Sequence, residues 1–200
     1  MSNSIVGFDL GTINTSYCQV RIKDLKILKW GMVDIKDSTN EGSCKKLVNK
    51  LNPIDLCSDG DTMIVIEQQP RINVKTIMIS GFVHMYYTMK KMERVESEED
   101  YNITKIVGHH AKHKIKYYEP REGDGPMPER LAKLKKGHYQ TKQICIEHCR
   151  RVMKHNEESQ EWIDFFEKSV KKDDLADSFL MTLSYIKMNK LQEKLKDTVN

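Results

Sequence analysis

The sequence predicts an α/β fold in which helices flank a mixed five-stranded sheet. Three segments rich in strand-forming residues follow one another closely near the N-terminus, and their short connections favour an antiparallel meander. Two later strand-like segments alternate with helical patterns, which is typical of a sheet with helices packed on it. The 200 residues suffice for one domain with a sizeable core, so we expect a single domain over residues 1–200.

The five strands are predicted at residues 5–12, 15–23, 25–35, 62–66 and 103–108. The third is assigned because Ile27, Trp30 and Val33 are strand formers with short spacers between them. The fourth is a continuous apolar run of β-branched character, which is typical of a buried central strand. Glu67 ends this run, and Pro70 then favours an extended chain because proline disfavours a helical conformation at the residue before it.

Helical spacing of apolar residues predicts helices at residues 43–51, 73–92, 141–154 and 159–170, and a last helix from 171 through 191. The helix at 73–92 is apolar on more than one face, and these faces include Phe82, Met85, Tyr86 and Met89. Either a helix of a second subunit or deeper burial in its own fold would cover these side chains. The charged, Pro- and Gly-rich stretch at about 119–140 is predicted to be a mobile insertion.

The composition predicts a soluble, intracellular protein. Charged residues make up 31% of the chain, no apolar run approaches the roughly 20 residues of a membrane span, and the N-terminus lacks a signal pattern. The five cysteines are odd in number and form no CxxC motif, so free thiols in a reducing compartment are the simplest expectation. We expect no membrane partner and no small-molecule cofactor.

Positive charge is concentrated in one part of the chain. Residues 101–156 hold 13 Lys and Arg against 5 Asp and Glu, together with six of the seven histidines, whereas the remainder is acidic overall. A basic block beside acidic flanks favours a polyanionic partner such as nucleic acid, and a solvated surface is the simpler alternative. His109, His110 and His113 could bind zinc, but no cysteine lies near them in sequence, which favours phosphate contact or a plain surface.

Four carboxylates stand where acids are costly unless they are paired or bind a metal. Asp9 lies within the apolar first strand, and Glu67 ends the buried fourth strand, where open α/β sheets place their chemistry. Asp174 and Asp177 are three residues apart, so they share one face of the last helix. Each also has a simpler interpretation: an Asx-turn for Asp9, a solvated strand end for Glu67, and acids favoured by a helix N-terminus for the pair.

Taken together, the four acids predict a metal-dependent site for phosphoryl transfer. Carboxylates within a few ångströms repel one another unless divalent cations sit between them, and hard oxygen ligands suit Mg²⁺ or Mn²⁺. Two such ions about 3.5–4 Å apart would stabilise the attacking and leaving oxygens of an in-line displacement. With a basic surface beside the site, the natural substrate would be a nucleic-acid phosphodiester.

Three segments resemble the RuvC class of Holliday junction resolvases, and they occur in the order of that family: residues 7–11 (GFDLG), 64–71 (IVIEQQPR) and 174–178 (DLADS). The resemblance is greatest to the branch of poxviruses and other large DNA viruses, which has relatives in fungal mitochondria. It implies an RNase H-like fold, a homodimer, Mg²⁺-dependent symmetric nicking of four-way DNA junctions, and a role in recombination and in resolving replicated genomes. For a viral protein, the host cytoplasm is the expected location.

The resemblance assigns the catalytic and metal-binding roles to Asp9, Glu67, Asp174 and Asp177. It implies two Mg²⁺ ions per site, which Mn²⁺ could replace. The family also uses a lysine ahead of the last acids, and Lys142 is the preferred candidate because it stands at the head of a helix. Lys112, Lys135 and Lys136 stay open as alternatives, and Asp173 competes with Asp174 by one position. The candidate DNA contacts are Arg71, Lys112, Lys135, Lys136, Arg150, Arg151 and Lys154.

Two other classes of protein stay open. Residues 8–12 (FDLGT) also resemble the first phosphate loop of actin-like and sugar-kinase-like ATPases, which share the RNase H core. Those proteins use two copies of the core around a nucleotide, whereas this chain has room for one copy and carries two extra acids on its last helix. A junction-binding protein without catalysis is the third class, and the complete set of acids argues against it.

Overall fold

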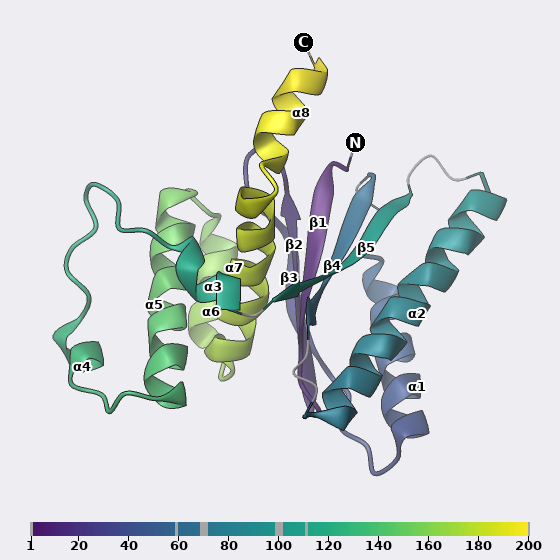
Figure 1. Cartoon of the computed structure of the whole chain (residues 1–200), viewed down its shortest axis with the longest axis horizontal. Helices are drawn as coiled ribbons and strands as arrows, with labels where there is room; N and C mark the ends of the chain where they lie inside the picture. The colour runs from purple at the N-terminus through teal and green to yellow at the C-terminus, as the bar shows by residue number, and fades with distance from the viewer. Residues whose placement is uncertain (1, 59, 69–71, 99–101, 111, 200) are drawn as a thin grey trace.

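The computed structural model describes residues 2–58, 60–68, 72–98, 102–110 and 112–199. A central sheet carries helices on both of its faces (Figure 1). The strands are β1 Ser4–Leu10, β2 Asn14–Arg21, β3 Ile27–Asp34, β4 Thr62–Gln68 and β5 Ile103–His110. The predicted α/β architecture with a five-stranded sheet is confirmed.

The sheet is mixed, as predicted, and its strand order is β3-β2-β1-β4-β5. β1 pairs antiparallel with β2, and β2 pairs antiparallel with β3, so the first three strands form the expected meander. β1 pairs parallel with β4, which in turn pairs parallel with β5. Because β1, β4 and β5 run in the same direction, their carboxyl ends meet at one edge of the sheet.

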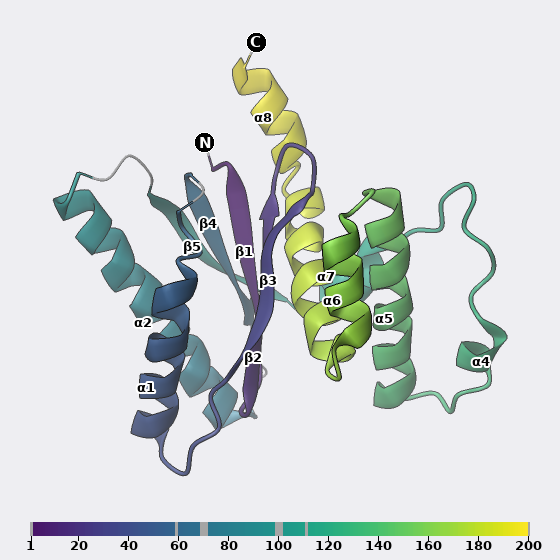
Figure 2. The ribbon, with the colours of Figure 1, turned by 180° about the vertical axis from the view of Figure 1, so that it is seen from behind.

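Different helices cover the two faces of the sheet (Figures 1 and 2). α1 Asn40–Leu51 and α2 Val74–Glu96 pack on one face, and η1 Asn52–Ile54 continues α1 as a short 3-10 turn. α7 Lys172–Met188 packs on the other face, where it contacts α3 Lys112–Tyr117, α5 His138–His155 and α6 Gln160–Lys168. The remaining two helices, α4 Glu129–Ala132 and α8 Leu191–Val199, contact α5 and α7 respectively.

The alternation of side chains along β1 and β4 separates two hydrophobic cores. Ile5 and Val65 belong to the core on the α7 side of the sheet. Phe8 belongs to the core on the side of α1 and α2. Because residues two or four apart on a strand share a face, Asp9 lies on the same side as Ile5, and Glu67 lies on the same side as Val65. The two carboxylates are therefore both on the α7 side.

Close packing fixes α7 against the middle of the sheet. A Cβ atom at Gly7 would lie 2.1 Å from Thr182 Oγ1, so glycine is the residue that lets the helix approach β1 this closely. The Ser16 hydroxyl of β2 donates a hydrogen bond of 2.6 Å to the carbonyl oxygen of Asp174. These contacts hold the first turns of α7 beside the carboxyl end of β1.

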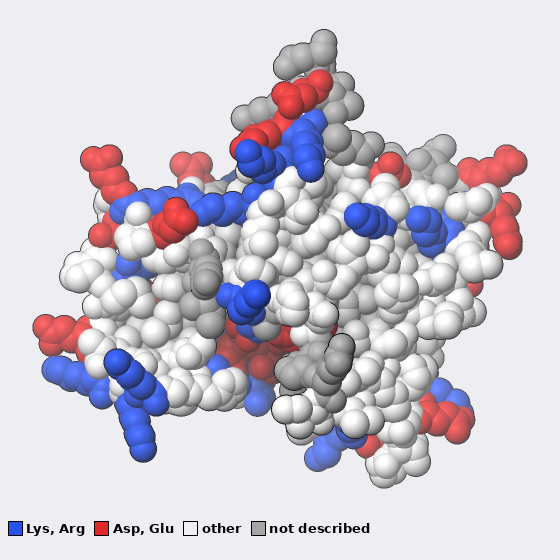
Figure 3. All heavy atoms as spheres, viewed as in Figure 1, with Lys and Arg blue, Asp and Glu red and all other residues white. Residues whose placement is uncertain are grey.

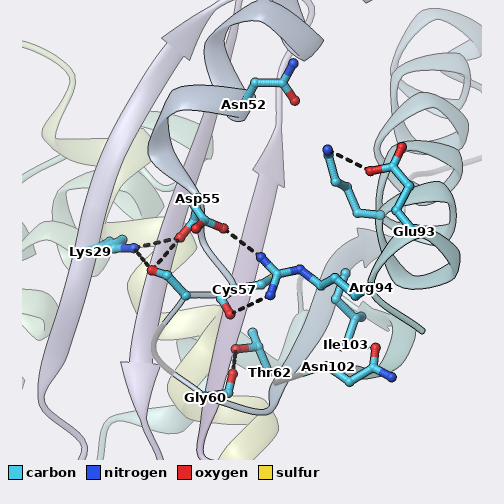
Figure 4. A network of polar contacts seen from close by, with 12 residues as sticks. Lys29, Asn52, Asp55, Cys57, Gly60, Thr62, Glu93, Arg94, Asn102 and Ile103 are labelled. Atoms are coloured by element: carbon cyan, nitrogen blue, oxygen red, sulfur yellow. Dashed lines mark hydrogen bonds and ion pairs between the residues drawn. The ribbon is translucent and has the colours of Figure 1, made fainter. Parts of the chain in front are cut away.

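A polar network fixes α2 on the opposite face (Figure 4). Arg94 of α2 donates hydrogen bonds of 3.0 Å to Asp55 Oδ1 and 3.4 Å to the carbonyl oxygen of Cys57. Lys29 of β3 donates to the carbonyl oxygen of Asp55 at 2.7 Å and to Ser58 Oγ at 2.8 Å. The connection between η1 and β4 is thereby tied to both β3 and α2, which sets the orientation of the long helix.

Several helix boundaries differ from the predictions. α3 forms after β5, where no helix was expected, and α2 extends to Glu96. The predicted last helix is two helices, because Lys190 has a φ of 51° in the left-handed region and interrupts the hydrogen-bond pattern between α7 and α8. The predicted insertion contains α4 and the first turn of α5. Within the described residues, no helix has the length and apolar character that crossing a membrane requires.

Candidate active site

Asp9 and Glu67 lie on neighbouring parallel strands at the same edge of the sheet. The β1–β4 register pairs Phe8 with Ile66, so the next residue on each strand brings the two acids side by side. Both carboxylates are largely buried, with 15% and 11% of their side chains exposed. The two apolar strands, which pack in the core, thus place both acids at one point.

α7 contributes Asp177, Asp174 and Asp173 to the same region. Asp177 is nearest the sheet, because the ammonium group of Lys114 contacts both its carboxylate and the two strand acids. Asp174 lies about one helical turn before Asp177 and is half-buried. Burial raises the pKa of Asp174, and the adjacent negative charge of Asp173 acts in the same direction. Three of the four acids predicted from the sequence therefore meet directly, and the fourth adjoins them along the helix.

Lys114 of α3 occupies the centre of this acidic cluster. Its Nζ atom lies 2.6 Å from Asp177 Oδ2, 3.2 Å from Asp9 Oδ1 and 3.2 Å from Glu67 Oε1. Only 11% of the Lys114 side chain is exposed. Figure 3 shows acidic side chains gathered in a hollow near the middle of the molecule, on the face viewed in Figure 1. We call Asp9, Glu67, Asp177 and Lys114 the acidic centre.

The electrostatics of the acidic centre reflect burial and mutual charge. Burial would lower the pKa of Lys114, but the charges of Asp9, Asp177 and Glu67 outweigh this effect and raise it. Burial raises the pKa of Asp9 well above its ordinary value, against the opposing effect of Lys114, and the negative charges of Glu67 and Asp177 raise it further. Burial likewise raises the pKa of Asp177. The carboxylates are thus poorly solvated and need a cation among them.

The acidic centre has the donor chemistry of a divalent-cation site. Within residues 2–58, 60–68, 72–98, 102–110 and 112–199, no group of three or more His, Cys, Asp or Glu is spaced to enclose a metal ion. Instead, the Lys114 ammonium stands where three carboxylates converge. Carboxylate oxygens that converge on one cation, with no sulfur or imidazole among them, fit Mg²⁺ or Mn²⁺.

Solved structures with a similar fold include three resolvases. The yeast mitochondrial Holliday junction resolvase Ydc2 has a TM-score of 0.60 and 15% identity, over 98% of this chain and 84% of its own. The fowlpox virus resolvase, in complex with substrate Holliday junction DNA, has a TM-score of 0.58 and 15% identity, over 93% and 98%. RuvC of Thermus thermophilus, in complex with a Holliday junction substrate, has a TM-score of 0.57 and 9% identity, over 94% and 96%.

The chain has the RuvC fold. This agrees with the RNase H-like fold that the three sequence segments imply. No family model matches the sequence, and a comparison with curated proteins gives no match either. The likeness to the RuvC fold is therefore carried by the arrangement of the backbone and not by overall sequence identity.

The lysine preferred from the sequence has a different place in the RuvC fold of this chain. Lys142, in the second turn of α5, pairs with Asp173 Oδ2 at 2.5 Å. This hydrogen bond raises the pKa of Lys142, and it lowers the pKa of Asp173 although burial acts in the opposite direction. Asp173 is thus engaged at the rim of the site. Lys114 contacts the strand acids instead, although no pattern in the sequence distinguishes it from its basic neighbours.

A buried layer surrounds the acidic centre of this RuvC fold. His109 of β5, which is in register with Glu67, donates from Nε2 to Ser184 Oγ at 2.8 Å, because Ser184 already donates its own proton to Met181. Burial lowers the pKa of His109 to about 4, so the ring is neutral at pH 7. Its ring stacks on that of His113 with the centroids 5.1 Å apart, which packs β5 against α3. These rings stack on one another and do not converge on a zinc position.

The basic residues predicted to contact DNA divide into two groups. Lys112, Lys135, Lys136 and Lys154 are exposed. Arg150 and Arg151 instead form contacts within the chain, since Arg150 pairs with Glu167 at 2.6 Å and Arg151 pairs with Glu147 at 3.1 Å. Arg71 lies outside the described residues. The four lysines are therefore accessible to a ligand, whereas the two arginines are engaged in salt bridges.

Proposed function

We propose that this chain is a metal-dependent endonuclease that resolves four-way DNA junctions by nicking phosphodiesters. The single observation that supports the proposal most is the acidic centre, where Asp9, Glu67 and Asp177 from three separate elements meet around one cationic group. The solved structures with this fold add support, because two of them are complexes with Holliday junction DNA.

We infer that Asp9, Glu67, Asp174 and Asp177 would hold two Mg²⁺ ions, for which Mn²⁺ could substitute. Bound there, such ions would polarise the scissile phosphate and activate the attacking water. The strands hold Asp9 and Glu67 rigidly, and Ser16 holds the backbone of Asp174. Lys114 keeps the carboxylates together in the absence of metal, so we assign it the role of the basic residue that the sequence analysis gave to Lys142.

The residues around the centre would keep Asp177 in place and exclude water. Cys145 of α5 is buried beside Asp177; burial raises the pKa of its thiol to about 12, and the negative charge of Asp177 and a hydrogen bond to its carboxylate act in the same direction. The thiol is therefore protonated at pH 7 and can only donate to the acid. A buried donor of this kind restricts the rotamers of Asp177.

We also propose a homodimer, because two symmetric nicks require two active sites related by a two-fold axis. One face of α2 is exposed and apolar, and the most exposed of its large side chains are Val74, Met85, Met89, Met92 and Val95. Gly81 lies within α2, and beyond the helix's own backbone and its chain neighbours no atom of the described residues lies within 4 Å of its Cβ position, which would permit close approach of a second helix. Contiguous apolar patches on a surface commonly mark interfaces.

Nicking of a labelled four-way junction, compared with a linear duplex of the same sequence and with ATP hydrolysis, tests the proposal. We expect Mg²⁺-dependent cutting of the junction, abolished by Glu67→Gln with binding retained, since phosphate contacts carry affinity and metals carry the chemistry. ATP hydrolysis without nicking would favour the actin-like alternative. Junction binding with no nicking in any divalent metal would favour the non-catalytic alternative.

A further inference from the structure

A cavity of about 480 Å³ lies between the first turns of α5 and the connection from α6 to α7. Its walls include Arg130 of α4, Tyr139 and Lys142 of α5, and Lys172 and Asp173 of α7. We call it the α5–α7 groove. None of the proposed metal-binding acids lines it, so it is separate from the acidic centre.

The α5–α7 groove adjoins the acidic centre through one ion pair. Lys142 and Asp173, which line the groove, are joined at 2.5 Å. Asp173 immediately precedes Asp174 and lies about one turn before Asp177 on α7. A DNA strand that ran from the acidic centre toward α5 would pass this pair and reach the groove.

The charge of the groove is opposite to that of the acidic centre. Its lining carries four cationic side chains, of Arg130, Lys142, Arg150 and Lys172, and two anionic ones, of Glu167 and Asp173. Lys172 Nζ donates to the carbonyl oxygen of Ser169 at 2.9 Å, and an ammonium group has three donors, so Lys172 can also contact a phosphate. The net positive lining fits a phosphodiester backbone.

Apolar surface stands among these charges. Tyr139 is 64% exposed and Val170 is 96% exposed, although both line the groove, and the buried Ile146 also contributes to its lining. Surfaces that bind single-stranded nucleic acid combine a cationic groove with aromatic side chains on which bases stack. The groove has this combination, because the exposed Tyr139 lies among its cationic side chains. A helix that only faced solvent would not need an exposed aromatic side chain.

We propose that the α5–α7 groove binds one nucleotide of the cleaved strand beside the scissile phosphate, with its base stacked on Tyr139 and its phosphate near Lys172 and Arg130. This inference rests on the proposed nuclease function, because it assigns the path that the cut strand takes. Base stacking does not depend on hydrogen-bond patterns, so the groove would accept any base and would position the strand without reading its sequence.

Fluorescence of 2-aminopurine tests the groove. The base analogue is placed at successive positions around the branch point of a four-way junction, and binding is measured without metal in the Glu67→Gln background, where the DNA stays intact. We expect one position at which fluorescence of the complex is lower with Tyr139 than with Tyr139→Ala. We expect Tyr139→Ala to weaken binding about tenfold and Tyr139→Phe or Tyr139→Trp to retain it. His138→Ala, an exposed neighbour outside the groove, is the matched control.

Single-stranded DNA carrying the same probe separates this inference from the proposed function. Quenching that depends on Tyr139 with a single strand would support the groove even if the protein showed no preference for junctions. Equal fluorescence and affinity for the wild type, Tyr139→Ala and His138→Ala on both DNAs would overturn nucleotide binding in the groove, whether or not junctions are nicked. Equal losses in Tyr139→Ala and Tyr139→Phe would overturn the stacking role, because phenylalanine retains the aromatic face.

Discussion

Lys114 brings a positive charge into surroundings made of carboxylates. Burial of an ammonium group is unfavourable, and three ion pairs of 2.6–3.2 Å offset this cost. A divalent cation bound to the same carboxylates would supply the same compensation. The stability of the metal-free protein should therefore depend on Lys114, and that of the metal-bound protein should depend on it less.

Replacement of Lys114 by methionine tests this dependence. Lys114→Met leaves three carboxylates without their cation, so we expect a loss of about 3 kcal/mol in the unfolding free energy in metal-free buffer. Added Mg²⁺ or Mn²⁺ should restore more stability to this variant than to the wild type, as measured by thermal unfolding. Lys142→Met is the control, since the salt bridge of Lys142 is with Asp173 at the rim. Equal metal effects in the three proteins would contradict the role of Lys114.

The raised pKa values of Asp9 and Asp177 predict a pH dependence. The pKa of each carboxyl group is higher in the folded protein than in the unfolded chain, where it is about 4. At a pH between the two pKa values, the folded protein therefore holds more protons than the unfolded chain. The stability of the metal-free protein falls as the pH rises through this range. The contribution of Lys114, whose pKa is also raised, is lost only at pH above its unfolded value near 10.4 and is constant in that window. A metal must displace the carboxyl protons, so its affinity rises with pH.

Titration calorimetry with Mn²⁺ in two buffers of different ionisation enthalpy measures the proton release directly. We expect the enthalpies to differ most between the buffers at low pH and to converge as the pH rises, with tighter binding at higher pH. Enthalpies independent of the buffer across the whole pH range, with an affinity that does not change with pH, would mean that Asp9 and Asp177 are already ionised in the metal-free protein.

At the scale of single residues, the sequence identifies the strand acids because apolar strands make any carboxylate conspicuous. Asp9 and Glu67 interrupt runs that are otherwise buried, and α7 places Asp177 opposite them. Lys114 has no such signal: it stands among Lys112, Lys116 and neighbouring histidines and has the pattern of a basic surface. Its burial depends on α3, a six-residue helix too short to have a helical period.

At the scale of elements, the segment between α3 and α5 is held to α5 by a polar network. Arg151 donates to the carbonyl oxygens of Gly125 and Pro126, both at 2.9 Å, and Asp124 accepts hydrogen bonds from Tyr118 and His155. These bonds also lower the pKa of Asp124. Such contacts between residues distant in sequence leave no local pattern, so composition alone predicts only a loop.

Arg151 and Lys154 are expected to differ in their effects. Arg151→Met should open the segment at 119–137 to proteolysis, because its bonds to that segment are lost, while the salt dependence of DNA binding changes little. Lys154→Met should leave proteolysis unchanged and lower the salt slope of binding by about one, as for a lost phosphate contact. Limited trypsin digestion and binding at several salt concentrations measure both. The reverse outcome would mean that Arg151 contacts DNA and Lys154 does not.

At the scale of the whole molecule, the order of the elements determines most of the fold. Short connections predict the meander of β1 to β3, and the helical patterns that alternate with the later strands predict a mixed sheet, as found. The α2 surface was predicted only in part, since Phe82 and Tyr86 pack on the core of their own chain whereas Met85 and Met89 are exposed. Apolar periodicity marks the faces of a helix but does not distinguish a core from an interface.

Met85→Glu tests the proposed dimer, because it places a charge on the exposed face of α2 without entering the core. We expect sedimentation to show a shift from dimer toward monomer, with the thermal unfolding midpoint of the fold otherwise near that of the wild type. Met188→Glu, at a comparably exposed methionine at the end of α7, is the control and should stay dimeric. A wild type that sediments as a monomer even with junction DNA present would refute the interface.

We propose that the acidic centres of two subunits cut a four-way junction at two symmetric positions. The most direct measurement is strand-resolved mapping of every cut in a four-way junction with each strand labelled in turn, in the presence of Mg²⁺. We predict nicks at symmetry-related positions in two opposite strands, all absent with Glu67→Gln. Nicks that persist in Glu67→Gln, or that fall with no two-fold relation and equally on linear duplex, would contradict the account.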